Sequence, residues 1–396
     1  MSVQRAGLNQ YASTIQILEG SDNRNAASVA VALEGLTDRT AFLRGQMDSA
    51  IAQTWHRFTY SLSDASNILP YTDGVGTEGF MVWIYGDPQW RICLDDGQQY
   101  TQTNNGIDVG TRAQRPGVAY MLAVEEVTVP HYTAGLQTEF STDAGINWIA
   151  GDALPANLKV FHAAWANVTA SGAWVLAAAD ATNDWPYVCL FDAAGNLISS
   201  TNLLAGSMAD QDWSSVCVGG ADGSIVILAE DGNYYRSAEG AGNDPVWTAH
   251  FGPWTDGVKI DWSVESGFVA VWPNTAAGSF KWSQSDDGIT WSAAVTQSFA
   301  YADTSVGDEL SDANARPCFA VLRGLWAIVT WDSDTPKVGI RITYSTDQGD
   351  TWWHHGVHAP SLTGPPSLAK NASGLGFCVE NNYWVSLKAG DPRFGG

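Results

Sequence analysis

The sequence predicts an all-β protein, a ring of four-stranded sheets called a β-propeller that carries an N-terminal helical extension. Three observations predict it. A short turn sequence occurs three times. From Trp55 onward, strand-like runs and turns recur at intervals of about fifty residues, which matches the length of a four-stranded propeller blade. Residues 1–54 differ, because a helical heptad pattern replaces the strands there.

The repeated turn combines an aspartate, a glycine and a tryptophan at fixed spacing. Its copies contain Asp143, Gly145 and Trp148, then Asp286, Gly288 and Trp291, then Asp347, Gly349 and Trp352. Aspartate accepts hydrogen bonds from backbone N–H groups, glycine adopts a positive φ, and tryptophan buries a large ring between neighbouring sheets. We therefore expect a structural role for all of these residues.

These residues resemble the Asp-box, or sialidase-type (BNR), repeat, S-x-D-x-G-x-T-W, which in that family lies between the third and fourth strands of a propeller blade. The first copy has Asn147 in place of threonine, and the second has Gln284 where the other two have serine. The resemblance implies a propeller. Because the box usually lies away from the active site in that family, it says little about activity.

Seven repeats are expected in residues 55–396, and six blades are the alternative if one weak repeat is misread. The turns that mark them lie at Asn104–Gly106, Asp143, Asp192, Glu239, Asp286 and Asp347. An insertion around 301–316 explains the long last interval. The final repeat stops after a third strand at 383–388, so we expect the segment Trp55–Ser61 to supply the missing outer strand and close the ring.

Residues 1–54 are predicted to be an attachment or oligomerisation segment. One short strand is expected at 11–18, followed by a long helix after the capping residues 21–25. Apolar residues recur in this helix at alternating spacings of four and three, the heptad pattern of a helix that packs on a partner. They include Val29, Leu33, Leu36, Leu43 and Met47. The alternative is an amphipathic helix that packs on its own domain.

The same stretch carries a second resemblance. Residues 25–48, centred on E-G-L-T-D-R-T-A-F-L at 34–43, resemble N-terminal segments of tailed-phage virion proteins, in which a similar helix precedes a distal module. The resemblance implies attachment to a phage tail, a tail fibre or a phage-like particle, in several copies or as a homo-oligomer. Such a protein is made in the host cytoplasm without a Sec signal.

The composition excludes several classes of partner. Lys and Arg total 19 against 42 for Asp and Glu, a net charge of −23, which argues against binding to nucleic acid or to an anionic membrane. No signal sequence and no apolar run long enough to span a membrane is found. The five cysteines stand singly on apolar runs, so we expect free thiols. No cofactor and no metal is expected.

The sequence offers little sign of catalysis. A sialidase needs convergent arginines, but Arg115-Pro116 and Arg316-Pro317 lack the middle residue of that family's Arg-Ile-Pro signature. The acidic residues leave a glycosidase-type carboxylate pair open without indicating one. His354, His355 and His358 suit a metal only on a helix, whereas a strand with a break at Gly356 is expected there.

Seven tryptophans have no place in the repeated turns. They are either core between blades, which we favour, or exposed surfaces on which sugars stack. These are Trp90, Trp165, Trp185, Trp213, Trp254, Trp272 and Trp331.

We expect a non-enzymatic structural protein of a virion or phage-like particle. Its helix would bind other particle proteins, and its propeller would present a surface to a host glycan or to a neighbouring particle protein. The alternatives are a glycoside hydrolase acting on a surface polysaccharide and a cytosolic propeller scaffold.

Overall fold

The structure is a computed structural model that describes the following residues. These are 3–6, 14–17, 56–59, 66–84, 89–94, 99–103, 109–125, 136–180, 182–183, 185–203, 213–230, 232–237, 245–255, 257–274, 279–298, 318–332, 339–358, 367–372, 374–379 and 382–385. The chain divides into the units Met1–His56 and Arg57–Gly396.

The described strands of the larger unit form seven four-stranded antiparallel sheets, numbered here 1 to 7 in chain order. Sheet 1 contains β4 (Ser66–Thr72), β5 (Glu78–Ile84), β6 (Gln89–Leu94) and β7 (Gln99–Thr103). Sheet 2 contains β8 (Val109–Gln114), β9 (Met121–Glu125), β10 (Gln137–Ser141) and β11 (Ile149–Ala153). Sheet 3 contains β12 (Leu158–Ala166), β13 (Ala173–Asp180), β14 (Pro186–Phe191) and β15 (Leu197–Asn202). Sheet 4 contains β16 (Ser215–Gly219), β17 (Ile225–Ala229), β18 (Asn233–Ser237) and β19 (Trp247–Phe251). Sheet 5 contains β20 (Lys259–Ser263), β21 (Gly267–Pro273), β22 (Ser279–Ser285) and β23 (Val295–Ser298). Sheet 6 contains β24 (Phe319–Leu322), β25 (Leu325–Asp332), β26 (Gly339–Ser345) and β27 (Trp353–His358). Sheet 7 contains β28 (Ser367–Lys370), β29 (Leu375–Val379), β30 (Asn382–Val385) and β3 (His56–Thr59).

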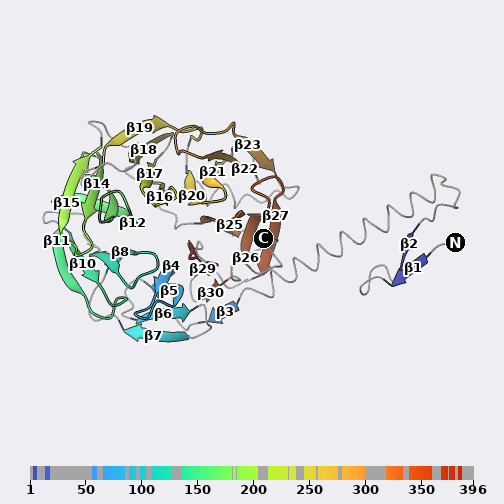
Figure 1. Ribbon diagram of the computed structural model, residues 1–396, viewed down its shortest axis with the longest axis horizontal. Helices are drawn as coiled ribbons and strands as arrows, with labels where there is room; N and C mark the ends of the chain where they lie inside the picture. Colours follow the sequence, from blue (N-terminus) through green and yellow to red (C-terminus); the bar gives the residue numbers. More distant parts are fainter. Residues whose placement is uncertain are drawn as a thin grey trace. The chain divides into compact units, whose positions relative to one another are not determined.

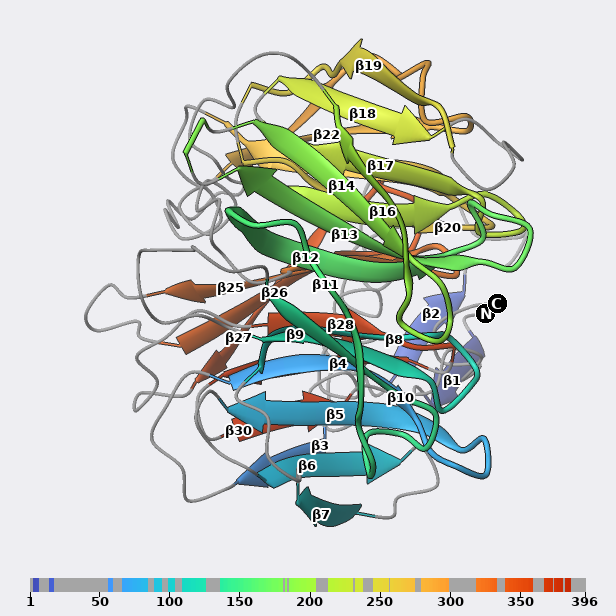
Figure 2. The same cartoon turned by 90° about the vertical axis from the view of Figure 1, so that its left-hand side faces the viewer.

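The sheets are arranged as a ring (Figure 1). The first strand of each sheet contacts the first strand of the next, and β28 of sheet 7 contacts β4 of sheet 1, so the circle is closed. At right angles to that view, the strands run roughly along the axis of the ring (Figure 2). The predicted all-β propeller is confirmed.

Sheet 7 joins the two ends of the ring. Its first three strands come from the C-terminal part of the chain, and its outer strand is β3, which pairs beside β30. β3 lies inside the segment Trp55–Ser61, from which the sequence analysis expects the outer strand. The hydrogen bonds between β30 and β3 therefore connect strands that are far apart in the sequence.

The smaller unit contains one described pair of strands. β1 (Val3–Ala6) pairs antiparallel with β2 (Thr14–Ile17), and β2 lies within the expected strand at 11–18. No sequence pattern predicted β1. The predicted helix, with Val29, Leu33, Leu36, Leu43 and Met47, lies outside the described residues.

The core is divided among the spaces between sheets. The middle strands are buried on both faces, as β17 is along its whole length, because each sheet is covered by a neighbour on either side. One cluster combines Val175 and Val188 of sheet 3 with Val226 and Leu228 of sheet 4. The outer strands are exposed instead, as in β23. Alternation of apolar and polar residues is therefore weak in the middle strands.

We predict that Trp352→Ala lowers the free energy of unfolding by about 3–5 kcal/mol, because it empties a large buried site between sheets 5 and 6. Thermal and urea unfolding followed by circular dichroism will measure it. Phe251→Ala is the control, since that aromatic residue is 87% exposed, and its expected cost is about 0.5 kcal/mol or less. Equal losses in the two variants would contradict the assignment of Trp352 to the core.

Candidate functional site

Two of the repeated turns have the same hydrogen bonds. In the first, the Asp143 carboxylate accepts bonds from the Ser141 hydroxyl (2.8 Å) and the Asn147 backbone N–H (2.8 Å), and the Gly145 N–H donates to Ser141 Oγ (2.8 Å). In the turn after β26, Asp347 accepts from Ser345 Oγ and Thr351 N, and Gly349 N donates to Ser345 Oγ, each at 2.8 Å. The serine hydroxyl and the aspartate carboxylate thus accept hydrogen bonds from backbone N–H groups of the turn that have no partner in a strand.

The turn after β22 corrects one residue assignment. Here the anchoring pair is Ser285 and Asp287, 3.0 Å apart, and Asp287 Oδ1 accepts from the backbone N–H groups of Ile289 (2.8 Å) and Thr290 (2.7 Å). The prediction of Asp286 as the anchor is therefore wrong. Both anchors stand one residue later than the spacing suggests, because this turn has one residue fewer between its serine and its glycine.

The glycines of these turns are required by the backbone and by packing. Ala144 and Gly145 have φ values of 60° and 81°, and Gln348 and Gly349 have 56° and 91°, the two successive positive values of a type I′ turn. A Cβ atom at Gly145 would lie 2.3 Å from Cζ3 of Trp90 in the preceding sheet. A larger residue would therefore force the two sheets apart.

The tryptophan that follows each turn packs on the preceding sheet. Trp148 meets Trp90 edge-on with ring centroids 5.8 Å apart. Trp352 meets Phe280 at 4.8 Å. Trp291 meets Tyr234 at 6.2 Å and donates its Nε1–H to the Tyr234 hydroxyl at 3.1 Å. The three turns with these side chains, called the Asp turns below, are thus joints between sheets.

We predict that Asp287→Ala destabilises the protein by about 1–3 kcal/mol, because it removes two backbone hydrogen bonds to a charged group. Asp286→Ala, a neighbour without those bonds, is the control and is expected to be nearly neutral. Partial burial alone would raise the pKa of Asp287, but the hydrogen bonds from Thr290 and Ile289 lower it to about 2. The stabilisation is therefore complete above pH 3.8 and disappears as the pH falls through 2. Parallel melting curves of both variants at neutral pH will compare the two losses of stability. A larger loss in Asp286→Ala than in Asp287→Ala would restore the sequence-based assignment.

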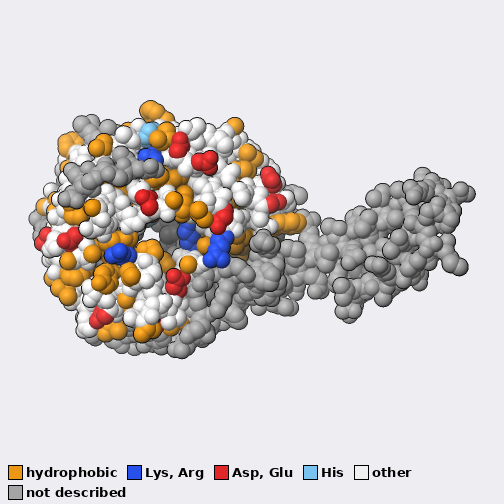
Figure 3. Space-filling model, in the orientation of Figure 1, with side chains coloured by type: hydrophobic (Ala, Val, Ile, Leu, Met, Phe, Trp, Pro, Cys, Tyr) orange, Lys and Arg blue, Asp and Glu red, His pale blue; other side chains and the backbone are white. Residues whose placement is uncertain are grey.

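Polar side chains join the innermost strands of the consecutive sheets 5, 6 and 7. Lys370 Nζ of β28 contacts Asp261 Oδ1 of β20 at 2.7 Å and donates to the carbonyl oxygens of Trp262 (2.6 Å) and Val321 (3.0 Å). The Val321 N–H of β24 donates to Asp261 Oδ2 at 2.6 Å. Lys and Arg side chains lie around the central opening on the face shown in Figure 3.

Other junctions between sheets use the same device, a polar side chain that bonds the backbone of the neighbouring sheet. Gln114 of β8 both accepts from Thr72 N and donates to Thr72 O, each at 2.7 Å. Lys259 Nζ donates to Ser214 O at 3.0 Å. Asn371 Nδ2 donates to Gly79 O at 3.2 Å, across the junction of sheets 7 and 1. Each of these polar side chains therefore joins two neighbouring sheets.

His162 lies at the junction of sheets 3 and 4. Its Nε2 is 3.0 Å from the carbonyl oxygen of Trp213, so this nitrogen carries the proton that it donates. Burial lowers the pKa of His162 to about 4, the bond to Trp213 opposes the shift, and the positive charge of Lys259 adds to it. The imidazole is therefore neutral at physiological pH.

We predict that stability falls as the pH drops from 6.5 to 4, since the unfolded chain then binds about one proton more at His162 than the folded chain does. His162→Gln keeps an N–H donor without the titration, so the difference in melting temperature between wild type and variant should change across this interval and stay constant above it. Melting curves from pH 4 to 8 will show whether it does; a constant difference throughout would refute the assignment.

The described cysteine side chains are buried thiols. Cys93, Cys189, Cys217 and Cys318 form no disulfide, as expected from the sequence. Burial raises the pKa of Cys189 to about 11, against a hydrogen bond with Ser200 that lowers it. Burial, and then the charge of Asp261, raise the pKa of Cys217. Only the thiolate reacts or binds a metal, so the thiols of Cys189 and Cys217 are poor nucleophiles at neutral pH.

Within the described ranges, no three His, Cys, Asp or Glu side chains gather closely enough to hold a metal ion. The residues His354, His355 and His358 lie on strand β27, as expected. The expected break at Gly356 is absent, because Gly356 pairs with Arg341 inside the ladder. The described ranges contain no helix with the length and apolar character that a membrane crossing requires.

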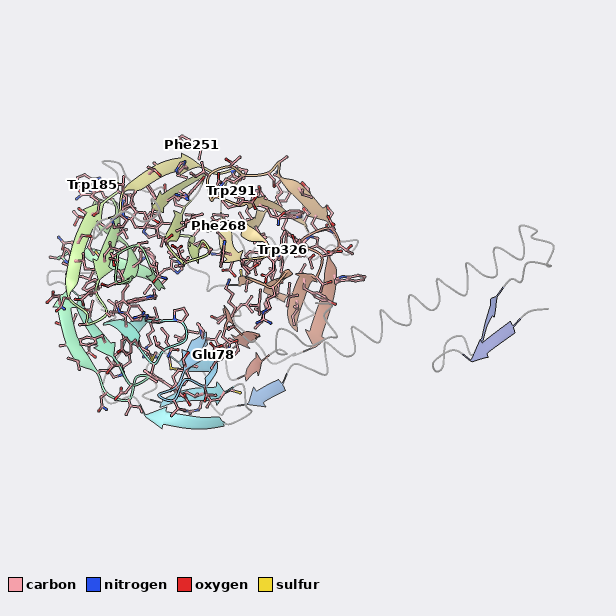
Figure 4. The ribbon with its side chains drawn as sticks, in the orientation of Figure 1. Glu78, Trp185, Phe251, Phe268, Trp291 and Trp326 are labelled. Carbon is pink, nitrogen blue, oxygen red and sulfur yellow. The ribbon has the colours of Figure 1, made fainter. Side chains whose placement is uncertain are left out.

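The unassigned tryptophans are mostly core. Trp90, Trp165, Trp213, Trp254 and Trp272 are buried. Trp185 is the exception at 36% exposure, and the side chain of Trp331 lies outside the described residues. Phe251 is 87% exposed. Both exposed rings lie at the outer rim of the ring, away from the channel (Figure 4).

Comparison with known proteins identifies the fold. No protein-family model and no curated protein matches the chain. Among solved structures, a catalytically inactive virginiamycin B lyase from Staphylococcus aureus with quinupristin matches at a TM-score of 0.55 with 10% identity, over 84% of this chain and 99% of that one. A streptogramin B lyase gives 0.55 with 10% identity, over 85% and 99%. BBS1N in complex with ARL6DN gives 0.52 with 8% identity, over 86% and 99%. Identities this low show a shared propeller fold and nothing about function.

Proposed function

We propose that this chain is a non-enzymatic binding protein, a seven-bladed propeller with Asp-box repeats, carried by its N-terminal helix on a virion or phage-like particle. Its propeller presents a surface to a host glycan. The support for the particle is the sequence resemblance at residues 25–48. The support for binding without catalysis comes from the ionisable side chains of the propeller.

The observation that carries the proposal is how the described carboxylates are used. Every described carboxyl group whose pKa departs from its usual value is lowered, and each of them accepts hydrogen bonds from the backbone of its own turn. A general acid at neutral pH needs a raised pKa instead. The one carboxylate described in the central network, Asp261, is held by Lys370 and Val321. These groups serve the fold.

The surface that we propose for the glycan lies where the chain crosses from one sheet to the next, called here the crossover face. In antiparallel sheets, the end of an outer strand and the start of a third strand lie at this same face. Phe251 ends β19, and Trp185 immediately precedes β14 of the neighbouring sheet 3. The Asp180 carboxylate accepts from the backbone N–H groups of Thr182 (2.7 Å) and Asn183 (3.1 Å) and so shapes the connection that presents Trp185.

The chemistry of this surface favours a neutral sugar. An aromatic face stacks on the C–H face of a pyranose, and the exposed Thr182 and Asn183 offer hydrogen bonds to hydroxyl groups. A polyanionic glycan is disfavoured by the net charge of −23.

For attachment, we predict that Leu43→Asp in the full chain abolishes co-purification with density-purified particles of the source culture, because it places a charge in the heptad interface. Ala41→Asp introduces the same charge outside that interface and should leave co-purification unchanged. Quantitative mass spectrometry of the particles reads both. If the wild-type chain is absent from the particles, the particle assignment is wrong, and a screen for polysaccharide hydrolysis becomes the next experiment.

For binding, we predict that Trp185→Ala and Phe251→Ala each weaken binding to a glycan microarray by about ten-fold, the loss expected for one stacked aromatic ring. Val264→Ala is the control, since Val264 is 71% exposed on the opposite face, between β20 and β21. Equal binding by all three variants would contradict the proposed location of the binding surface. If the wild-type chain binds no glycan on the array, the proposal that the ligand is a glycan is wrong.

A further inference from the structure

The ammonium group of Lys370 joins three sheets at one point. Its three N–H groups match three acceptors, the carboxylate of Asp261 and the carbonyl oxygens of Trp262 and Val321, at 2.6 to 3.0 Å. Lys370 belongs to sheet 7, Val321 to sheet 6, and Asp261 and Trp262 to sheet 5. The side chains of Lys370 and Asp261 are 30% and 18% exposed, so solvent screens this ion pair less than it screens a pair at the surface.

Val321 makes the three-sheet connection mutual. Its N–H donates to Asp261 Oδ2 while its carbonyl oxygen accepts from Lys370. The first strand of each sheet has no strand partner on its channel side, so both backbone groups of Val321 would otherwise lack a protein partner there. Removing the lysine therefore leaves two carbonyl oxygens and a carboxylate oxygen without the donor that they share.

The network lies next to the point where the ring is closed, which is sheet 7. In sheet 7, β30 and β3 are held together by hydrogen bonds and not by a chain connection. On the sheet 1 side, the described polar ties are Asn371 Nδ2 to Gly79 O at 3.2 Å and Ile68 N to Ser367 Oγ at 3.5 Å. These are longer than the bonds of Lys370.

We infer that Lys370 is a latch: it holds β28–β30 in the ring, and without it these three strands detach locally while sheets 2 to 4 stay folded. Local opening of this kind is a property of the least stable cooperative unit of a protein. The latch uses none of the residues proposed for glycan binding or for attachment, so it does not depend on the proposed function.

Hydrogen–deuterium exchange of the full chain tests the latch. Lys370→Met keeps the length and packing of the side chain without its charge. It should raise exchange at least about ten-fold in β24 and β28–β30 and leave β13 and β14 unchanged. Lys281→Met, at a half-buried lysine of β22, is the matched control and should change neither region. Asp261→Asn, which removes the charge from the other side, should reproduce the regional pattern of Lys370→Met.

Chemical rescue supplies the second measurement. In Lys370→Ala, added propylammonium replaces the missing atoms and should restore protection of β28–β30, whereas 1-propanol, its neutral counterpart, should not. Two results would overturn the inference: unchanged exchange in β28–β30 of Lys370→Met, or an equal rise in every sheet. Rescue by 1-propanol to the same extent would also do so, since it would show that packing and not the ammonium group holds the strands.

Discussion

The structure depends on how a ring of sheets deals with its inner edge. Each first strand pairs with one neighbour only, so a row of backbone N–H and C=O groups faces the channel without a strand to bond. Side chains from adjacent sheets bond to some of these groups: Gln114 bonds Thr72, Lys259 bonds Ser214, and Lys370 bonds Val321. Each such bond also joins two sheets. Satisfying the edge and closing the ring are therefore one event, which explains why polar side chains are buried at the centre of this molecule.

Farther from the channel, aromatic rings join adjacent sheets. Because each sheet meets two others, the apolar core is a set of separate layers, and a tryptophan is large enough to fill a layer alone. The Asp turns place such a ring on the preceding sheet each time, as Trp148 does on Trp90. The high tryptophan content of the sequence is thus mostly a property of the architecture, and a ring that does not fill a layer, such as Trp185, stands out.

The sequence predicts those features that local chemistry determines. The turn residues and the strand periodicity predicted the propeller, and the missing fourth strand of the last repeat pointed to the segment Trp55–Ser61, in which β3 lies. The wrong assignment of Asp286 shows what residue spacing alone does not predict. When the repeats are aligned on their glycines, Asp286 takes the place of the anchoring aspartate. The hydrogen bonds to Asp287 show instead that this turn is one residue shorter. The bond between Asp261 and Lys370 joins residues more than a hundred positions apart, and neither has a sequence signature. Only the closed ring brings them together.

The position of β3 has a consequence for how this protein can be cut into fragments. A recombinant propeller that begins at Ser66, where the first complete sheet starts, would lack β3 and leave the edge of β30 bare. A bare edge recruits strands from other molecules, so such a fragment would tend to associate with further copies through the edge of β30. The folding unit of the propeller therefore includes β3 and begins no later than His56.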